Sequence, residues 1–512
     1  MEAEREPGSS SGEAGVGSVA TPSWQAAVAP PPMSTPPMST PPPVAAADSS
    51  DDEFEDEAPD LLGSPIAAGR RLEDIALDRA RRRYDEEDPS EPRWKLHSKH
   101  IFVLSSAGKP VFSRYGDESQ LAPQMGMLQA LVSFVENMGD ELRYISAGRA
   151  NIVFLQRGAL YLVAVCSSGE TVEHVWRQLH LFHSQIISIL TKKVEQIFRR
   201  NASYDVRGLL GGTDRVMRSL IHSATTDPAM LMRAIPCLRV PANIRSELTR
   251  SMVASKPSEL LFGLMIAHNH LVTLLRPRKT SVHHDDVLLI MNTVASSTSF
   301  REDQAWLPIC LPRFNASGFL YAHVSYVLPE LCLVLLTPKA DAFAEASDCR
   351  AAIAARLETA GELRDGLLAA LHAPQYAVSE LGVPEVRHCI YRLPGGGGGA
   401  NSAGIDLYSA PRTGRLAGMQ CPYHQRAAVK RLLRHYMLAH ARVHHQLGKP
   451  LREYMQTTDD ELIVVWTAAD FELYVAFSPL VSKPVAYAAC HKLHRCLKKE
   501  TPNLFMLQAG SK

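Results

Sequence analysis

The sequence predicts a three-domain α+β chain, in which each domain is an antiparallel sheet flanked by helices. Three observations support this prediction. Short apolar runs with period-two alternation are separated by turn residues, as in the strands of antiparallel sheets. Longer segments with apolar residues three and four positions apart indicate amphipathic helices. The same order of elements (two strands, a helix, three strands, a long helix) occurs three times without repetition of the sequence itself, which favours three domains of one fold.

The first domain is expected over residues 98–225. Its helices should occupy 119–138 and 171–200, because apolar residues recur there with helical spacing. Strands are predicted at 100–105, 110–114, 141–147, 150–156 and 159–166, where short apolar runs lie between turn residues.

The second domain is expected over 226–373 and the third over 374–512. In the second domain we predict a hairpin over 259–275, helices near 284–296 and 341–358, and strands near 306–314, 318–327 and 330–337. In the third we predict a hairpin over 376–391, helices over 423–446 and 485–499, and strands near 452–457, 461–468 and 471–478. A Gly-rich insertion near 393–420, with five consecutive glycines from Gly395, interrupts the third domain. Chain of this composition is flexible.

Composition and motifs argue against catalytic chemistry. The nine cysteines are scattered without a CxxC pair, as is typical of reduced, buried thiols. No signal peptide opens the chain, and no apolar run reaches the roughly 20 residues that span a bilayer, so any membrane contact should be peripheral. The chain has no GxxxxGK[ST], GxSxG, HExxH or GxGxxG where its mechanism would need it. The glycines at 208, 211 and 212 indicate a helix end. We predict no catalytic residue, no cofactor, no metal and no nucleic-acid partner.

Two histidine groups have a functional and a structural interpretation. His283 and His284, followed by Asp285 and Asp286, have metal-ligand chemistry. They also stand where a helix of the second domain should begin, and aspartate there complements the helix dipole. His440 and His444 are four apart on a helix, the spacing for a shared zinc ion, but no third ligand accompanies them. We favour a helix start for the first group and a solvated helix face for the second.

Residues 1–97 are predicted to be a disordered acidic tail. They are rich in proline and small polar residues and contain MSTPP twice in succession. The tail holds 20 acidic and 9 basic residues, a net charge of −11, whereas the remainder holds 34 and 45, a net charge of +11. Ser49 and Ser50 precede an acidic run and are candidate phosphorylation sites. The tail is expected to bind the basic body, in competition with acidic lipids or an activating partner. Otherwise it is a recruitment arm or an inert linker.

One helix is more apolar than packing on a single sheet requires. In 119–138, one apolar stripe contains Leu121, Met125, Leu128, Val132 and Val135. A second stripe lies about 110° away around the helix and contains Met127, Leu131, Phe134 and Met138. Because a helix resting on one sheet needs only one stripe, we expect the second to contact a further body. This is either a partner subunit or GTPase, or another domain of the same chain.

Several stretches of the sequence resemble the SAND/Mon family of vacuolar fusion proteins. The first are KHIFVLSSAGKPVFSRYGDE at 99–118 and MGMLQALVSFVENMGDELRYI at 125–145. The resemblance continues through WLPICLPRFNASGFLYAHVSY at 306–326, VPEVRHCIYR at 383–392 and DFELYVAFSPLVSKPVA at 470–486. KKETPNLFML at 498–507 resembles the C-terminal ending of the family. The similarity therefore covers about 98–507, but neither the tail nor the Gly-rich insertion.

This resemblance implies three longin domains and a partner of similar build, the Ccz subunit. Together such subunits act as a guanine-nucleotide exchange factor for the late-endosomal Rab GTPase, in early-to-late endosome maturation, fusion with the lysosome or vacuole, and autophagy. The resemblance also implies a cytoplasmic protein that the early-endosomal Rab and phosphoinositides or anionic membranes recruit peripherally. Within the family the first longin domains form the GTPase platform, which would place the helix 119–138 near its centre. The alternative is a non-catalytic longin subunit of a vesicle coat or tether.

Overall fold

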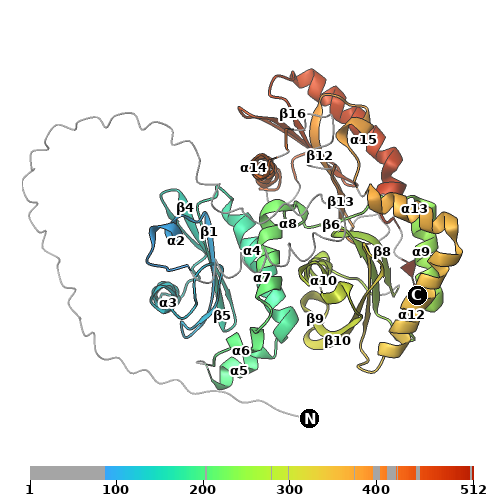
Figure 1. Ribbon diagram of the computed structural model, residues 1–512. Helices are drawn as coiled ribbons and strands as arrows, with labels where there is room; N and C mark the ends of the chain where they lie inside the picture. The colour runs from blue at the N-terminus through green and yellow to red at the C-terminus, as the bar shows by residue number, and fades with distance from the viewer. Residues whose placement is uncertain are drawn as a thin grey trace, which may run out of the picture. The chain divides into compact units, whose positions relative to one another are not determined.

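The computed structural model contains three antiparallel-dominated sheets flanked by helices (Figure 1). It describes residues 87–511 apart from 202–203, 278–279, 298, 374, 396–403, 412–421, 424, 446–449 and 508–509. All of these belong to one compact unit of the chain. Ser49, Ser50 and most of the predicted Gly-rich insertion lie outside the described residues. None of the helices in the described ranges is both long enough and apolar enough to cross a membrane.

The first sheet has the predicted strands in the order β2-β1-β5-β4-β3. Their bounds are β1 Lys99–Ser105, β2 Pro110–Ser113, β3 Tyr144–Ala147, β4 Ala150–Arg157 and β5 Leu160–Cys166. Side chains alternate between the two faces: Ile101 and Val103 belong to the core under helix α4 (Val172–Leu190), and Phe102 and Leu104 to the core under helix α3 (Ala122–Asn137). The sheet is therefore buried on both faces, with a separate core on each.

The expected helix over 171–200 is two helices, so this part of the prediction is wrong. Helix α4 ends at Leu190, and α5 (Val194–Arg200) begins after a turn at Thr191, whose φ is 58°. The Thr191 amide donates to the Ile187 carbonyl and ends the first helix. The chain continues through α6 (Arg207–Leu210), α7 (Asp214–Thr226) and α8 (Ala229–Met232). Helix α6 ends at Gly211, which confirms the predicted helix end there, whereas Gly208 lies within the helix.

The second sheet also follows the predicted order of elements, apart from its edges. Its strands are β7 Phe262–Ala267, β8 His270–Arg276, β9 Ala305–Leu311, β10 Ala316–Leu328 and β11 Leu331–Thr337, and its helices are α9 Ala242–Ser255, α10 His284–Ser296, α12 Phe343–Thr359 and α13 Gly361–His372. Strand β9 ends earlier than predicted because Pro312 begins the short helix α11 (Pro312–Asn315). Helices α9 and α13 were not predicted.

In the third sheet the predicted hairpin over 376–391 is wrong. This stretch contains a 3-10 turn, η3 (Val378–Leu381), and one strand, β12 (Val386–Leu393). The partner strand β13 (Leu407–Ser409) follows the insertion and pairs antiparallel with β12. The remaining elements agree with prediction: α14 Arg426–Val443, β14 Glu453–Thr457, β15 Leu462–Thr467, β16 Glu472–Phe477 and α15 Lys483–Leu504.

The second and third sheets exchange their outermost strands. Strand β6 (Ile235–Pro236) precedes the second sheet in sequence but pairs in parallel with β13 of the third. Strand β17 (Gly510–Ser511) follows the third sheet in sequence but pairs in parallel with β8 of the second. The third sheet is thus completed by a strand that precedes the second sheet in the sequence, and the second sheet by a strand that follows the third. The three domain boundaries themselves remain predictions.

The expected disorder does not extend to residue 97. Helix α2 (Pro92–Leu96) lies against the first domain, where the indole Nε1 of Trp94 donates to the Tyr115 carbonyl at 3.1 Å. The ring of His97 stacks on Tyr115 with 3.7 Å between centroids, and His97 lies 2.6 Å from the Glu87 carboxylate. Residues 87–97 are therefore part of the folded first domain.

Candidate protein-docking face on the first domain

Helix α3 has well-defined ends that follow from its sequence. Pro123 stands in its first turn, where a missing amide hydrogen costs no helical bond. At the other end the Met138 amide donates to the Val135 carbonyl, and Gly139 follows with a φ of +80°. A positive φ suits glycine, so the helix stops there.

The predicted first stripe of α3 is buried, apart from Val135, which is half-buried. Met125, Leu128 and Val132 are 0%, 5% and 1% exposed, and they pack on the face of the sheet that carries Phe102 and Phe154. At about 25 cal/mol per Å² of apolar surface removed from water, this burial is the main source of the helix's stability. The sheet therefore fixes which side of α3 faces inward.

Two polar contacts hold the helix in this rotation. The Tyr161 hydroxyl donates to the Glu136 carboxylate at 3.1 Å, near the last turn of the helix. Burial and the adjacent carboxylate raise the pKa of Tyr161 to about 12, so the hydroxyl remains a donor at any physiological pH. Gln129 Nε2 donates to the carbonyl of Ser106, just after β1, at 3.5 Å, and to the Ser133 hydroxyl of its own helix at 2.8 Å.

The second stripe of α3 is exposed. Met127, Leu131, Phe134 and Met138 expose 61%, 38%, 67% and 72% of their surface. No part of the chain that the structure describes buries them, so contact with another described domain does not account for the stripe. They lie at positions i, i+4, i+7 and i+11, and α3 carries a single charged side chain, Glu136. A row of large apolar side chains in water, with few charges among them, is typical of a surface that binds a partner.

Helix α4 on the opposite face provides a comparison. It is buried on several sides, because beyond the sheet it packs against α7, α10 and β9. Its broad apolar surface is thus covered by other elements of the same chain. Helix α3 has a comparably broad apolar surface, but among the described elements it packs mainly on the sheet.

The histidine group at the start of α10 serves the helix. The His283 ring accepts a hydrogen bond from the Asp285 amide and caps the helix. Asp285 lies 3.0 Å from Arg313 Nε, and the Asp286 carboxylate accepts from the Arg313 and Phe314 amides at 3.1 and 2.9 Å. Ligand atoms of His283, His284 and Asp285 do lie within 4.8 Å of one another. Protein donors nevertheless engage these carboxylates, in agreement with the predicted helix start.

Burial dominates the titration of this group. It raises the pKa of Asp286 to about 6 and, with the neighbouring His284, lowers the pKa of His283 to about 4. Burial alone would raise the pKa of Asp285, but hydrogen bonding by His284 and the charges of the two histidines and Arg313 hold it below its ordinary range.

His440 and His444 do not form a solvated helix face, so that expectation is wrong. Their rings lie 4.2 Å apart, and His440 stacks on Tyr474 of strand β16. The His444 Nε2 atom is 3.5 Å from the Glu472 carboxylate on the same strand. The pair therefore packs helix α14 onto the third sheet. Burial, with the neighbouring His444, lowers the pKa of His440 well below its usual value.

Two arrangements were not predicted from the sequence. One is a buried guanidinium, Arg245, that binds carbonyls of the C-terminal segment. The other is a cavity at which Arg114 and Arg434 meet. Each joins residues more than 250 positions apart, and no local motif marks either.

Comparison with known proteins agrees with the three-domain architecture. The chain matches the first Longin domain of FUZ, MON1 and HPS1 over residues 99–220, the second over 258–355 and the third over 408–501. The three matched ranges overlap the first, second and third sheets in turn.

Full-length relatives cover most of the chain. It is 36% identical over 458 residues to Protein SAND of Takifugu rubripes, covering 89% of this chain and 84% of that protein. It is 37% identical to Vacuolar fusion protein MON1 homolog A of Homo sapiens, with coverage of 90% and 68%. It is 34% identical to the MON1 homolog of Arabidopsis thaliana, with coverage of 84% and 72%. With its three longin domains, this chain belongs to the SAND and MON1 family of vacuolar fusion proteins.

Proposed function

We propose that this chain acts in membrane fusion at the vacuole or lysosome, as one subunit of a heteromeric guanine-nucleotide exchange factor for a late-endosomal Rab GTPase. Its partner would be a second longin protein of the Ccz type. The observation that carries the proposal is the exposed stripe of α3, in a chain whose relatives are named vacuolar fusion proteins.

The physical requirements of nucleotide exchange fit such a surface. An exchange factor must bind the nucleotide-free GTPase more tightly than the nucleotide-bound form, which it does by displacing a switch loop from Mg²⁺ and phosphate. This needs a shaped docking surface and no nucleophile. A docking helix with Phe134 and two methionines supplies aromatic and adaptable apolar contacts.

The assembly would be peripheral to membranes. The basic excess of the body, +11 over residues 98–512, supports attraction to anionic lipids or to an acidic surface of an early-endosomal Rab. The acidic tail would compete with the lipids and the Rab for the basic surface of the body.

The test is release of labelled GDP from a panel of Rab GTPases, with this chain alone, its Ccz-type partner alone, and both together. We expect fast release from a late-endosomal Rab with both chains only. Substitution of Phe134 by aspartate in the complete assembly should abolish release. Stable association with the partner, without acceleration of release from any Rab, would instead favour the coat or tether subunit.

A further inference from the structure

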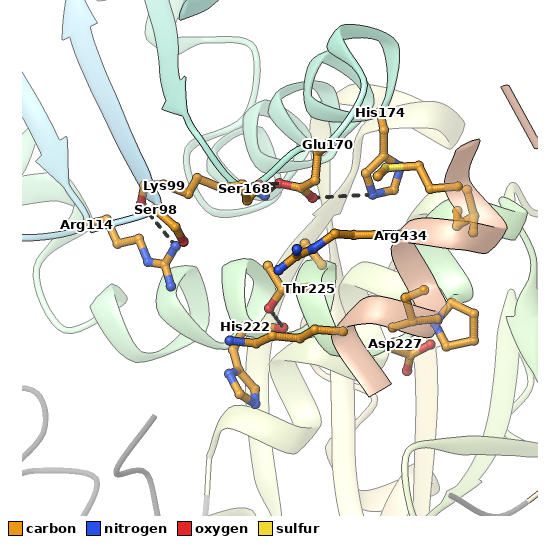
Figure 2. A pocket seen from close by; sticks show the side chains of 16 residues that line it. Ser98, Lys99, Arg114, Ser168, Glu170, His174, His222, Thr225, Asp227 and Arg434 are labelled. Atoms are coloured by element: carbon orange, nitrogen blue, oxygen red, sulfur yellow. Dashed lines mark hydrogen bonds and ion pairs between the residues drawn. The ribbon is translucent and has the colours of Figure 1, made fainter. Parts of the chain in front are cut away.

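A cavity lies where the first domain, the segment after α7 and helix α14 of the third domain meet (Figure 2). Its volume is about 70 Å³, enough for several water molecules and therefore for one tetrahedral phosphate group. The side chains that line it carry four formal positive charges, on Lys99, Arg114, Lys430 and Arg434, and two negative charges, on Glu170 and Asp227.

Both carboxylates are already engaged by other groups. Glu170 forms a buried ion pair with Lys99, and the Lys99 ammonium also donates to Gln178 Oε1 at 2.9 Å. Asp227 accepts a hydrogen bond from the Tyr408 hydroxyl at 2.6 Å and from the Ala229 amide at 2.7 Å. Glu170 is thus neutralised by Lys99, whereas Asp227 keeps its charge, so the lining has a formal excess of two positive charges.

The two arginines of the cavity have no acidic partner among the described residues. Arg434 is half-buried on α14, and Figure 2 shows its side chain extending into the middle of the cavity. Arg114 follows β2; its Nη1 donates to the Lys99 carbonyl at 3.1 Å, and its guanidinium lies 4.8 Å from the centre of the Tyr115 ring. Lys430, one helical turn before Arg434, adds a third cation from α14.

Like charges brought together in a partly buried space repel one another unless an anion lies between them. Guanidinium groups bind phosphate well because their planar N–H donors can contact two oxygens at once. We propose that this cavity binds a phosphate group, which Arg114 of the first domain and Arg434 and Lys430 of the third hold from opposite sides. Bound phosphate would then link the two domains. This inference does not depend on the proposed exchange activity.

The binding test uses the full chain and inorganic phosphate. Titration calorimetry and thermal unfolding are measured in phosphate and in chloride at equal ionic strength. We expect phosphate to raise the unfolding temperature by about 2 °C or more. Arg434→Gln and Arg114→Gln should each weaken phosphate binding about tenfold or more, because each removes a charge-assisted contact. Arg442→Gln, an exposed arginine of the same helix, is the matched control and should bind as the parent does.

A second readout separates ligand binding from a purely structural role. Without phosphate and at low salt, Arg434→Gln should be as stable as the parent or more so, because it removes a repelling charge. A further arm of the experiment uses vesicles that contain phosphatidic acid. Binding of the chain to these vesicles, without binding of inorganic phosphate in solution, would identify the bound phosphate group as that of a lipid headgroup. The proposal would be overturned if phosphate stabilised the parent and the Arg114→Gln/Arg434→Gln double variant equally. It would also be overturned if Arg434→Gln lost stability in phosphate-free buffer but kept the phosphate affinity of the parent.

Discussion

The Nη1 atom of Arg245 donates to the carbonyl oxygen of Phe505 at 2.8 Å, across 260 positions of the sequence. The same guanidinium donates to four more carbonyls, those of Leu238, Val272, Pro502 and Asn503. Arg245 is 6% exposed, and burial lowers its pKa to about 10. One side chain of helix α9 thus fixes the end of α15 and the segment that follows it.

Replacement of Arg245 by methionine should strongly destabilise this junction. Five carbonyls would lose a donor, three of them in fully buried hydrogen bonds, and a single unsatisfied buried group already costs about 1–3 kcal/mol. We expect a loss of about 3 kcal/mol or more in the free energy of unfolding, and faster hydrogen exchange over residues 502–506. Arg250→Met on the same helix is the control, since its side chain is 73% exposed; it should change stability by about 0.5 kcal/mol or less.

Phe134→Asp and Val132→Asp should have opposite consequences although the two residues are neighbours on α3. Phe134 is 67% exposed and Val132 1%. An exposed aspartate should leave the circular dichroism and protease resistance of the first domain unchanged while abolishing partner binding, GDP release or both. An unpaired charge at Val132 should unfold that domain. If Phe134→Asp retains both partner binding and exchange, the α3 face is not the docking site.

Gly126→Ala offers a gain of stability at the same face. Gly126 is exposed within α3, and a Cβ built there meets no atom within 4 Å. Alanine in an exposed helix interior is more favourable than glycine by about 0.5–1 kcal/mol, so chemical denaturation should show an increase of that size. A partner whose backbone approaches α3 closely at this point would bind the variant more weakly.

Stability should fall as the solution is acidified below about pH 6.5, partly because of His388. Burial lowers the pKa of this histidine to about 3, so the folded chain keeps it neutral while the unfolded chain protonates it near pH 6.5. The unfolded state therefore binds more protons, and stability declines by about 1.4 kcal/mol per pH unit for this residue. In His388→Asn, which keeps a polar atom near the Tyr436 hydroxyl, urea denaturation between pH 7 and 5 should show a shallower decline. His372→Asn, at an exposed position, should decline as the parent does.

Removal of the acidic tail should increase binding to anionic liposomes, and the increase should shrink at high salt because exposed charges are screened. The position of the cut matters. Residues 1–86 hold 17 acidic and 7 basic residues, a net charge of −10, so their deletion removes nearly all the charge. Deletion of 1–97 also removes Trp94 and His97 from Tyr115 and should lower the unfolding temperature of the first domain. Unchanged or weaker liposome binding after deletion of 1–86 would identify the tail as a linker or a recruitment arm.

The repeated topology was predictable because its strands and helices are long enough to show their periodicity. The third hairpin was not, because β13 has three residues and pairs with β12 across an insertion. Strands β6 and β17 have two residues each, too few for any alternation to be visible. The exposed apolar stripe of α3 could be predicted from the sequence, because the two stripes together are wider than one sheet can cover. The cationic cavity could not: Arg434 alone on a helix is indistinguishable from a solvated charge until the fold brings it to Arg114.

The exchange of β6 and β17 has a consequence for synthesis on the ribosome. Ile235 of β6 pairs with Leu407, and Leu275 of β8 pairs with Gly510. Each of these two strands is therefore synthesised long before the strand with which it pairs. At about 5–20 residues per second, the first delay is roughly 10–30 s. During that interval an apolar, unpaired segment of the nascent chain is available to chaperones and to aggregation. The second sheet acquires its edge strand β17 only after residues 510–511 have left the exit tunnel.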